Sequence, residues 1–252
     1  MIGKLFEINK DGSNIRCKIY IEKGETVRRA VIFGHGFGGH KDNKAAERFA
    51  DHVLKKQKDT AVITFNWPCH GDDVKKKLTL DDCDHYLDLV IRDTREKYPE
   101  AELYAYATSF GGYLFLKYIH DHGCPFMKTA LRCPAVNMYD VLTKTIMKND
   151  DADKLRKGKD VLVGFDRKVP VSRAFLDELQ AADIRAYDYL DFAGTMLILH
   201  GTKDEVVPLA DSRDFAENNL IEFIPVENAD HRFQNLKQMD EAIKLIREFF
   251  AR

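Results

Sequence analysis

The sequence predicts an α/β protein: a mostly parallel central sheet with helices on both faces and a cap insertion. Short continuous apolar runs, such as Ala30 to Phe33 and Ala61 to Phe65, alternate with amphipathic stretches of helical length. A strand that is buried on both faces has such a continuous apolar run. Regular alternation of these strands with helices indicates parallel strands joined by crossover helices. At 252 residues the chain can form one large domain of this class.

The individual elements follow from the same patterns. A β-hairpin is expected at the start, with strands over residues 4–9 and 14–21 joined by a tight turn at Asp11-Gly12. Further strands are predicted over residues 30–33, 61–65, 102–108, 129–132, 195–199 and 220–225. Helices are predicted over residues 43–57, 80–97, 110–121, 171–181, 209–218 and 236–251.

Between about residues 134 and 191 the alternation breaks. Charge-dense stretches there alternate with short apolar pieces such as Val161-Leu162-Val163. The segment is too long for a simple connection and too apolar in places to be disordered. We therefore expect one domain over residues 1–252, with a cap insertion at about 134–191.

Composition and charge argue against several classes of protein. The formal net charge of -2 gives no electrostatic reason to expect nucleic acid or an anionic membrane surface as a partner. The five cysteines include no C-x-x-C pair, so neither a zinc site nor a redox motif is indicated. No apolar segment approaches the ~18 residues of a membrane span, and the N-terminus is too charged for a signal peptide. A cytoplasmic location is the expectation.

The stretch Leu103 to Gly112 contains the first candidate for catalysis. A predicted strand ends there and a helix begins directly after Ser109, so the chain must turn sharply between small residues, here Ala107 and Gly111. A serine at such a turn projects its hydroxyl above the sheet edge, where the unpaired N–H groups of the helix favour negative charge. This arrangement is a nucleophile elbow. The alternative is that Ser109 only caps the helix.

A serine nucleophile also needs a base, a carboxylate that orients the base, and donors for the oxyanion. Open α/β sheets place their sites beyond the carboxyl ends of the strands, so polar residues that follow predicted strands are the candidates. They are His35, the loop after Phe65, Ser109, His200 with Asp204, and His231. The chain order serine, aspartate, histidine is the one expected for a hydrolase of this architecture.

Four segments resemble the signature segments of the α/β-hydrolase superfamily. They are His35-Gly36-Phe37-Gly38-Gly39, Ala107 to Gly112, His200 to Pro208, and Asp230-His231. Within the superfamily the chain is most similar to small single-domain esterases, which include bacterial feruloyl and cinnamoyl esterases, and to serine-aminopeptidase-like hydrolases. The resemblance covers nearly the whole chain. Only residues 134–191 fall outside it, and they would correspond to the variable cap of the family.

The resemblance implies a role for individual residues. Ser109 matches the nucleophile, Asp204 the acid and His231 the base. The oxyanion donors would be the backbone N–H groups of Phe37 and Phe110. Rivals for the acid are Glu205, Asp211 and Asp230, whereas structural roles are expected for His35, His70 and His200.

Two positions depart from the family pattern. Ala107 stands where a glycine is usual, and its methyl group is expected to crowd the turn. Thr108 stands where these esterases frequently have histidine. Neither departure removes a catalytic group.

The resemblance implies hydrolysis of a small-molecule carboxylic ester through a covalent acyl-enzyme, with neither a metal nor an organic cofactor. A peptidase or amidase, a thioesterase, and a non-catalytic binding protein on the same fold are the alternatives. No nucleic acid and no membrane partner is expected, and a homodimer is left open. Aromatic residues of the cap are candidates for contacting the acyl or aryl group: Tyr139 and Phe165, or Tyr187 and Tyr189.

Overall fold

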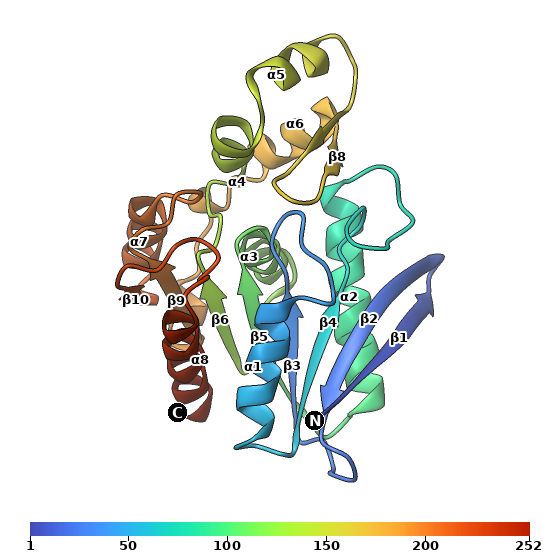
Figure 1. Ribbon diagram of the computed structural model, residues 1–252, viewed down its shortest axis with the longest axis vertical. Coiled ribbons are helices and arrows are strands. Elements are labelled where there is room, and N and C mark those ends of the chain that lie inside the picture. The colour runs from blue at the N-terminus through green and yellow to red at the C-terminus, as the bar shows by residue number, and fades with distance from the viewer.

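The computed structural model describes residues 1–252 and contains an eight-stranded mixed sheet (Figure 1). The strand order is β1-β2-β4-β3-β5-β6-β9-β10. The strands are β1 (Ile2–Lys10), β2 (Ser13–Ile21), β3 (Arg29–Gly34), β4 (Thr60–Phe65), β5 (Glu102–Thr108), β6 (Lys128–Arg132), β9 (Met196–Gly201) and β10 (Glu222–Val226). Strands β4, β3, β5, β6, β9 and β10 pair in parallel, and the hairpin β1–β2 joins them antiparallel through β2. The predicted α/β class with a mostly parallel sheet is confirmed.

Helices cover both faces of this sheet, as predicted. They are α1 (Lys44–Leu54), α2 (Leu80–Lys97), α3 (Phe110–His122), α7 (Leu209–Asn218) and α8 (Leu236–Ala251). Apolar residues of α1 and α8 form one core with one face of the sheet, and those of α2, α3 and α7 form a larger core with the other face. In β4, Ala61, Ile63 and Phe65 belong to the larger core and Val62 to the smaller one. This two-sided burial explains why the strand is a continuous apolar run.

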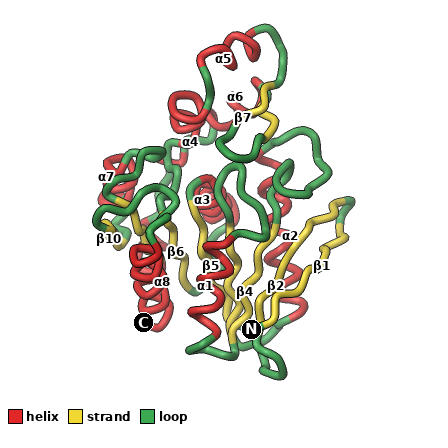
Figure 2. The backbone as a smooth tube through the Cα atoms, viewed as in Figure 1, coloured by secondary structure: helices red, strands yellow, loops and turns green.

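Residues 138–181, most of the predicted cap insertion, lie above the sheet in Figure 1, opposite the two chain termini. They form α4 (Met138–Asp140), a π-helical turn (Val141–Ile146), α5 (Asn149–Arg156), the hairpin β7 (Val161–Val163) and β8 (Val169–Val171), and α6 (Arg173–Ala181). The chain then returns along α3 to the start of β9 through two short 3₁₀ turns (Ile184–Ala186 and Leu190–Thr195). Figure 2 shows that loops make up much of this part of the chain.

Of the cap elements, only α6 was predicted, as a helix over residues 171–181. The sequence pattern missed α5 because this helix buries only Asp151 and Leu155 and has no apolar stripe. The strands β7 and β8 have three residues each, too few for a periodicity to be visible. None of the helices combines the length and the apolar character that crossing a bilayer requires.

Candidate active site

Ser109 lies at a strained turn between β5 and α3. Its backbone angles are φ 53 and ψ -119, a combination that L-residues seldom adopt and that costs about 1–3 kcal/mol. The backbone N–H of Ser109 donates to the carbonyl of Arg132 at 3.1 Å, and its carbonyl accepts from the N–H of Ala135 at 3.1 Å. The Ser109 side chain makes no capping hydrogen bond to α3. The geometry is that of the expected elbow, and the helix-cap alternative does not describe it.

Glycines let the loop after β3 approach this turn closely. A Cβ atom on Gly111 would lie 2.6 Å from the carbonyl oxygen of Gly34 and 2.7 Å from that of His35. A Cβ atom on Gly36 would lie 3.1 Å from Cβ of Ser109. The start of α3 and the loop after β3 therefore pack backbone to backbone beside the Ser109 hydroxyl.

The structure gives a reason for the alanine at position 107. Ala107 pairs with Gly34 across β5 and β3, and a Cβ atom on Gly34 would lie 3.3 Å from that of Ala107. The missing side chain of Gly34 therefore leaves room for the Ala107 methyl group. The neighbouring Thr108 is buried at the end of β5, and nothing in its surroundings explains the choice of threonine.

Three residues from distant parts of the chain meet at the carboxyl ends of the strands. His231, in the loop between β10 and α8, has its Nε2 atom 3.0 Å from Oγ of Ser109. Its Nδ1 atom lies 2.7 Å from Oδ2 of Asp204, which is in the loop after β9. Donation from Nδ1–H to the carboxylate leaves the Nε2 lone pair facing the Ser109 hydroxyl. This arrangement allows His231 to accept the hydroxyl proton.

The carboxylate of Asp204 is enclosed and held as an anion. Its side chain has 0% exposure, and Oδ1 accepts from the N–H groups of Val206 and Val207, each at 2.8 Å. Burial alone would raise the pKa of Asp204, but hydrogen bonds from His200, His231 and the backbone outweigh it and hold the pKa well below its usual range.

The rivals for this position have other contacts. Glu205 reaches only the backbone N–H of His231, at 3.4 Å. Asp230 accepts from the N–H of Gln234 at 3.0 Å, and Asp211 accepts from the side chain of Asn137. Among the four candidates, Asp204 is the one whose carboxylate contacts the imidazole of His231.

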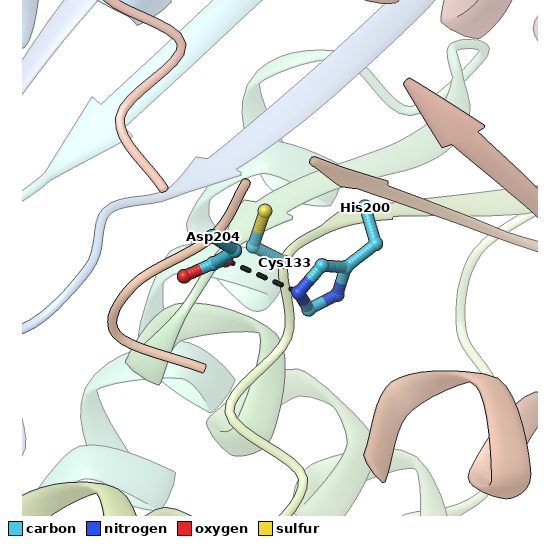
Figure 3. A group of neighbouring side chains, drawn as sticks. All are labelled: Cys133, His200 and Asp204. Carbon is cyan, nitrogen blue, oxygen red and sulfur yellow. Dashed lines mark ion pairs between the residues drawn. The ribbon is translucent and has the colours of Figure 1, made fainter. Parts of the chain in front are cut away.

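Sequence reasoning missed the surroundings of Asp204 on the side away from His231. His200, expected to be structural, places Nε2 3.1 Å from Oδ2 of Asp204 and 3.1 Å from the carbonyl oxygen of Val207. The thiol of Cys133 completes the cluster (Figure 3). The sequence feature that could have identified Cys133 is its position directly after β6. This strand neighbours β9, which Asp204 follows.

Cysteine, histidine and aspartate are also ligands for zinc, and their donor atoms here lie within 4.8 Å of one another. Burial and the neighbouring Asp204 raise the pKa of the Cys133 thiol well above its usual value. Oδ2 of Asp204 already contacts Nδ1 of His231 and Nε2 of His200.

The candidate oxyanion donors are Phe37, in the loop after β3, and Phe110, which directly follows Ser109. Phe110 begins α3, so its N–H has no partner within the helix. The N–H of Phe37 makes no hydrogen bond to the protein backbone. The rings of the two residues contact each other, with 5.6 Å between centroids, and both rest against His70.

His35 and His70 have the structural roles expected of them. His35 is buried, its Nδ1 bonds the carbonyl of Gly36 at 2.8 Å, and its own carbonyl accepts from the indole N–H of Trp67 at 2.9 Å. Nδ1 of His70 bonds the carbonyl of Pro68 at 2.8 Å, and burial lowers the pKa of His70 to about 4. Both imidazoles thus hold the loops beside Phe37.

The aromatic residues of the cap region divide into two groups. The hydroxyl of Tyr189 donates to the carbonyl of Leu116 at 3.1 Å, and Tyr187 stacks on His120 with 3.8 Å between centroids. Leu116 and His120 are seven and eleven residues beyond Ser109, about 10 and 16 Å along α3, so this tyrosine pair does not border the Ser109 hydroxyl. Phe165, in contrast, lies under the guanidinium of Arg232, next to His231.

Comparison with known proteins places this geometry in context. Residues 25–149 match the family described as serine aminopeptidase, S33. The structure is similar to that of Est1E from Butyrivibrio proteoclasticus (TM-score 0.75, 17% identity, covering 98% of this chain and 99% of that one), a protein also known with ferulic acid bound. It is also similar to a soluble variant of monoglyceride lipase from Saccharomyces cerevisiae in complex with a substrate analog (TM-score 0.73, 16% identity, covering 99% and 95%).

A third similar structure is the esterase domain of a protein from Rhodothermus marinus (TM-score 0.71, 16% identity, covering 98% and 96%). At these identities the likeness concerns the fold. A comparison of the sequence with curated proteins gives no match.

Proposed function

We propose that the chain is a serine hydrolase of the α/β-hydrolase superfamily and that it cleaves a carboxylic ester through a covalent acyl-enzyme. One observation carries the proposal: His231 bridges Ser109 and Asp204, with contacts of 3.0 and 2.7 Å. Nucleophilic catalysis by serine requires a base that faces the hydroxyl and that a carboxylate holds in one tautomer. Here the carboxylate is buried and the hydroxyl lies at a strained turn.

In this mechanism Ser109 Oγ forms a bond to the ester carbonyl carbon while His231 Nε2 takes the hydroxyl proton. The carbonyl π electrons move to the oxygen, and the N–H groups of Phe37 and Phe110 stabilise that oxyanion. Removing one such donor typically costs about 3 kcal/mol of transition-state stabilisation. Protonated His231 then gives its proton to the departing alcohol oxygen as the C–O bond breaks. Water, deprotonated by His231, hydrolyses the acyl-enzyme and restores Ser109.

An ester is the preferred substrate because several structures of the same fold are of esterases or lipases. The same three residues also serve amide or thioester cleavage, and the matched family is described as a serine aminopeptidase. A panel of p-nitrophenyl acyl esters, aryl esters, acyl thioesters and aminoacyl p-nitroanilides, ranked by kcat/KM, tests this. We expect the esters to have the highest kcat/KM. Faster cleavage of the anilides would make the protein a peptidase or amidase instead.

Labelling with a fluorophosphonate probe tests the nucleophile independently of the substrate. The wild-type protein and a Ser13→Ala control should be labelled, whereas Ser109→Ala should not be. His231→Ala should be labelled much more slowly because the hydroxyl loses its base. Circular dichroism establishes that each variant is folded. Equal labelling of Ser109→Ala and the wild type would refute the assignment, and a folded wild type that resists the probe would favour a non-catalytic protein.

A further inference from the structure

A polar pocket of about 280 Å³ lies between the cap and the loops that follow β3 and β4. On the sheet side it is lined by Gly38, His70 and Gly71, and on the cap side by Arg167 and Lys168. Figure 1 and Figure 2 show the loop of the cap hairpin next to these loops of the sheet. Gly38 directly follows Phe37, so the pocket adjoins the candidate oxyanion hole.

The turn between β7 and β8, residues 164–168, contacts two loops, one that contains His231 and one that contains Phe37. On one side Asp166 accepts a hydrogen bond from Arg232 at 2.7 Å, and the Arg232 guanidinium lies 5.5 Å from the ring centroid of Phe165. On the other side the backbone of Arg167 touches Gly38, where a Cβ atom would lie 3.1 Å from the Arg167 carbonyl oxygen. The turn therefore bridges the loop of His231 and the loop of Phe37.

The charge of this turn is unbalanced on the side of the pocket. Asp166 pairs with Arg232. Arg167 and Lys168 have no carboxylate partner, and Nζ of Lys168 donates to the carbonyl of Gly164 within the turn. Two acidic residues follow Gly71. Asp72 pairs with Lys41 at 2.8 Å, whereas Asp73 accepts from the N–H of Cys69 at 2.9 Å and from the hydroxyl of Tyr86 at 3.0 Å and has no cationic partner. Two cationic side chains thus border the pocket without a counter-ion, a setting in which a carboxylate binds a guanidinium with charge-assisted hydrogen bonds.

The sheet order decides which part of an ester would reach them. His231 and Asp204 follow β10 and β9, on one side of β5, whereas the pocket lies beyond β3 and β4, on the other side. The leaving alcohol must face His231 to receive its proton, so the acyl group extends toward the pocket. Gly36 contacts Ser109. Gly38 is two residues further on, and two residues of extended chain span at most about 7 Å. A short acyl chain spans this distance.

Given the proposed esterase activity, we infer that Arg167 and Lys168 select the substrate. The preferred substrates are half-esters of dicarboxylic acids, whose free carboxylate occupies this pocket while the ester carbonyl lies at Ser109. The two cations are thus specificity residues, and the ion pair of Asp166 with Arg232 holds the turn that carries them.

The test compares two esters of equal chain length, mono(4-nitrophenyl) adipate and 4-nitrophenyl hexanoate. Wild-type kcat/KM should be higher for the adipate, and this ratio should decrease about tenfold in Arg167→Ala/Lys168→Ala because an electrostatic contact of this kind is lost. Lys159→Ala, which changes an exposed lysine elsewhere in the cap, should keep the wild-type ratio. High salt should lower the wild-type ratio, because it screens exposed charges. An unchanged ratio in the double variant overturns the inference.

Binding separates this inference from the proposed activity. The Ser109→Ala protein should bind the intact adipate half-ester more tightly than the hexanoate ester, measured by titration calorimetry. The difference should disappear when Arg167→Ala and Lys168→Ala are added. Equal binding of the two esters overturns the inference even if the wild type hydrolyses both. If neither ester is hydrolysed but the binding difference is present, the proposed activity fails and the carboxylate pocket stands.

Discussion

One carboxylate oxygen of Asp204 serves two histidines: Oδ2 lies 2.7 Å from Nδ1 of His231 and 3.1 Å from Nε2 of His200. The other oxygen accepts two backbone N–H groups. Both oxygens are therefore saturated with donors, and the carboxylate has little freedom to rotate. A substitution that replaces a carboxylate oxygen of Asp204 with a hydrogen-bond donor therefore disturbs the position of His231.

Asp204→Asn should lower kcat by about four orders of magnitude, as in other serine hydrolases whose histidine is held by an aspartate. The amide N–H₂ replaces an acceptor, so either the Nδ1–H of His231 loses its partner or the imidazole takes the wrong tautomer. Hydrolysis of a 4-nitrophenyl ester measures the effect, with circular dichroism to establish folding. Glu205→Gln is the matched control and should stay within a few-fold of wild type. A comparable loss in Glu205→Gln would identify Glu205 as the acid.

Gly111→Ala should destabilise the fold and lower activity together. Its Cβ would lie 2.6 Å from the carbonyl oxygen of Gly34, so the strand end and the helix start must separate. Overpacking of this kind costs about 1–3 kcal/mol. The midpoint of urea unfolding measures the change in stability. Gly194→Ala, whose Cβ would have no atom within 4 Å, is the control and should change stability by no more than about 0.5 kcal/mol. Equal effects in the two variants would contradict this account of the turn.

Ala107→Gly should leave the chemistry nearly intact. The Ala107 methyl group occupies the space left by Gly34, and the strained angles of Ser109 are present with it in place. Restoring the usual glycine is expected to cost about 0.5–1 kcal/mol of stability through backbone entropy and to keep kcat/KM within about threefold. Thermal unfolding and ester hydrolysis measure the two quantities. A large increase in kcat/KM would show that the methyl group does hinder the nucleophile.

The stability of the protein should fall in mild acid because of its buried histidines. Burial lowers the pKa of His70 to about 4, below the ordinary value of 6.5. A lowered pKa in the folded state means that the unfolded chain takes up the proton first. The contribution of His70 to stability is therefore complete above pH ~6.5 and is lost as the pH falls toward ~4, by up to about 3 kcal/mol.

His70→Gln should flatten this dependence, because glutamine does not titrate. The free energy of unfolding, measured with urea at several pH values between ~6.5 and ~4, gives the slope. His35 is also buried with a lowered pKa, so part of the slope remains in this variant. A slope identical to that of the wild type would exclude His70 as a source of acid sensitivity.

Much of the fold was predictable because the apolar pattern of each strand and helix reflects which of its faces are buried. The run Ala61 to Phe65 is apolar throughout since both of its faces are covered, and α2 (Leu80–Lys97) has the predicted bounds. The cap was predictable only as a break in the alternation of strands and helices. Helix α5 has almost no apolar stripe, and the turn 164–168 is positioned by contacts with Arg232 and Gly38 that no local pattern encodes.

The sequence by itself determined the order of the elements and placed Ser109, Asp204 and His231 after strands, because parallel strands bring their carboxyl ends to one edge. That the backbone N–H groups of Phe37 and Phe110 hold the oxyanion was implied by the family resemblance and stays a prediction. Only the tertiary structure shows that Asp204, and not Glu205, Asp211 or Asp230, contacts the imidazole of His231, because carboxylates in neighbouring loops have the same chemistry and differ in the direction they point. The same holds for Ala107: its tolerance depends on Gly34, a residue 73 positions away that adjoins it only because β3 pairs with β5.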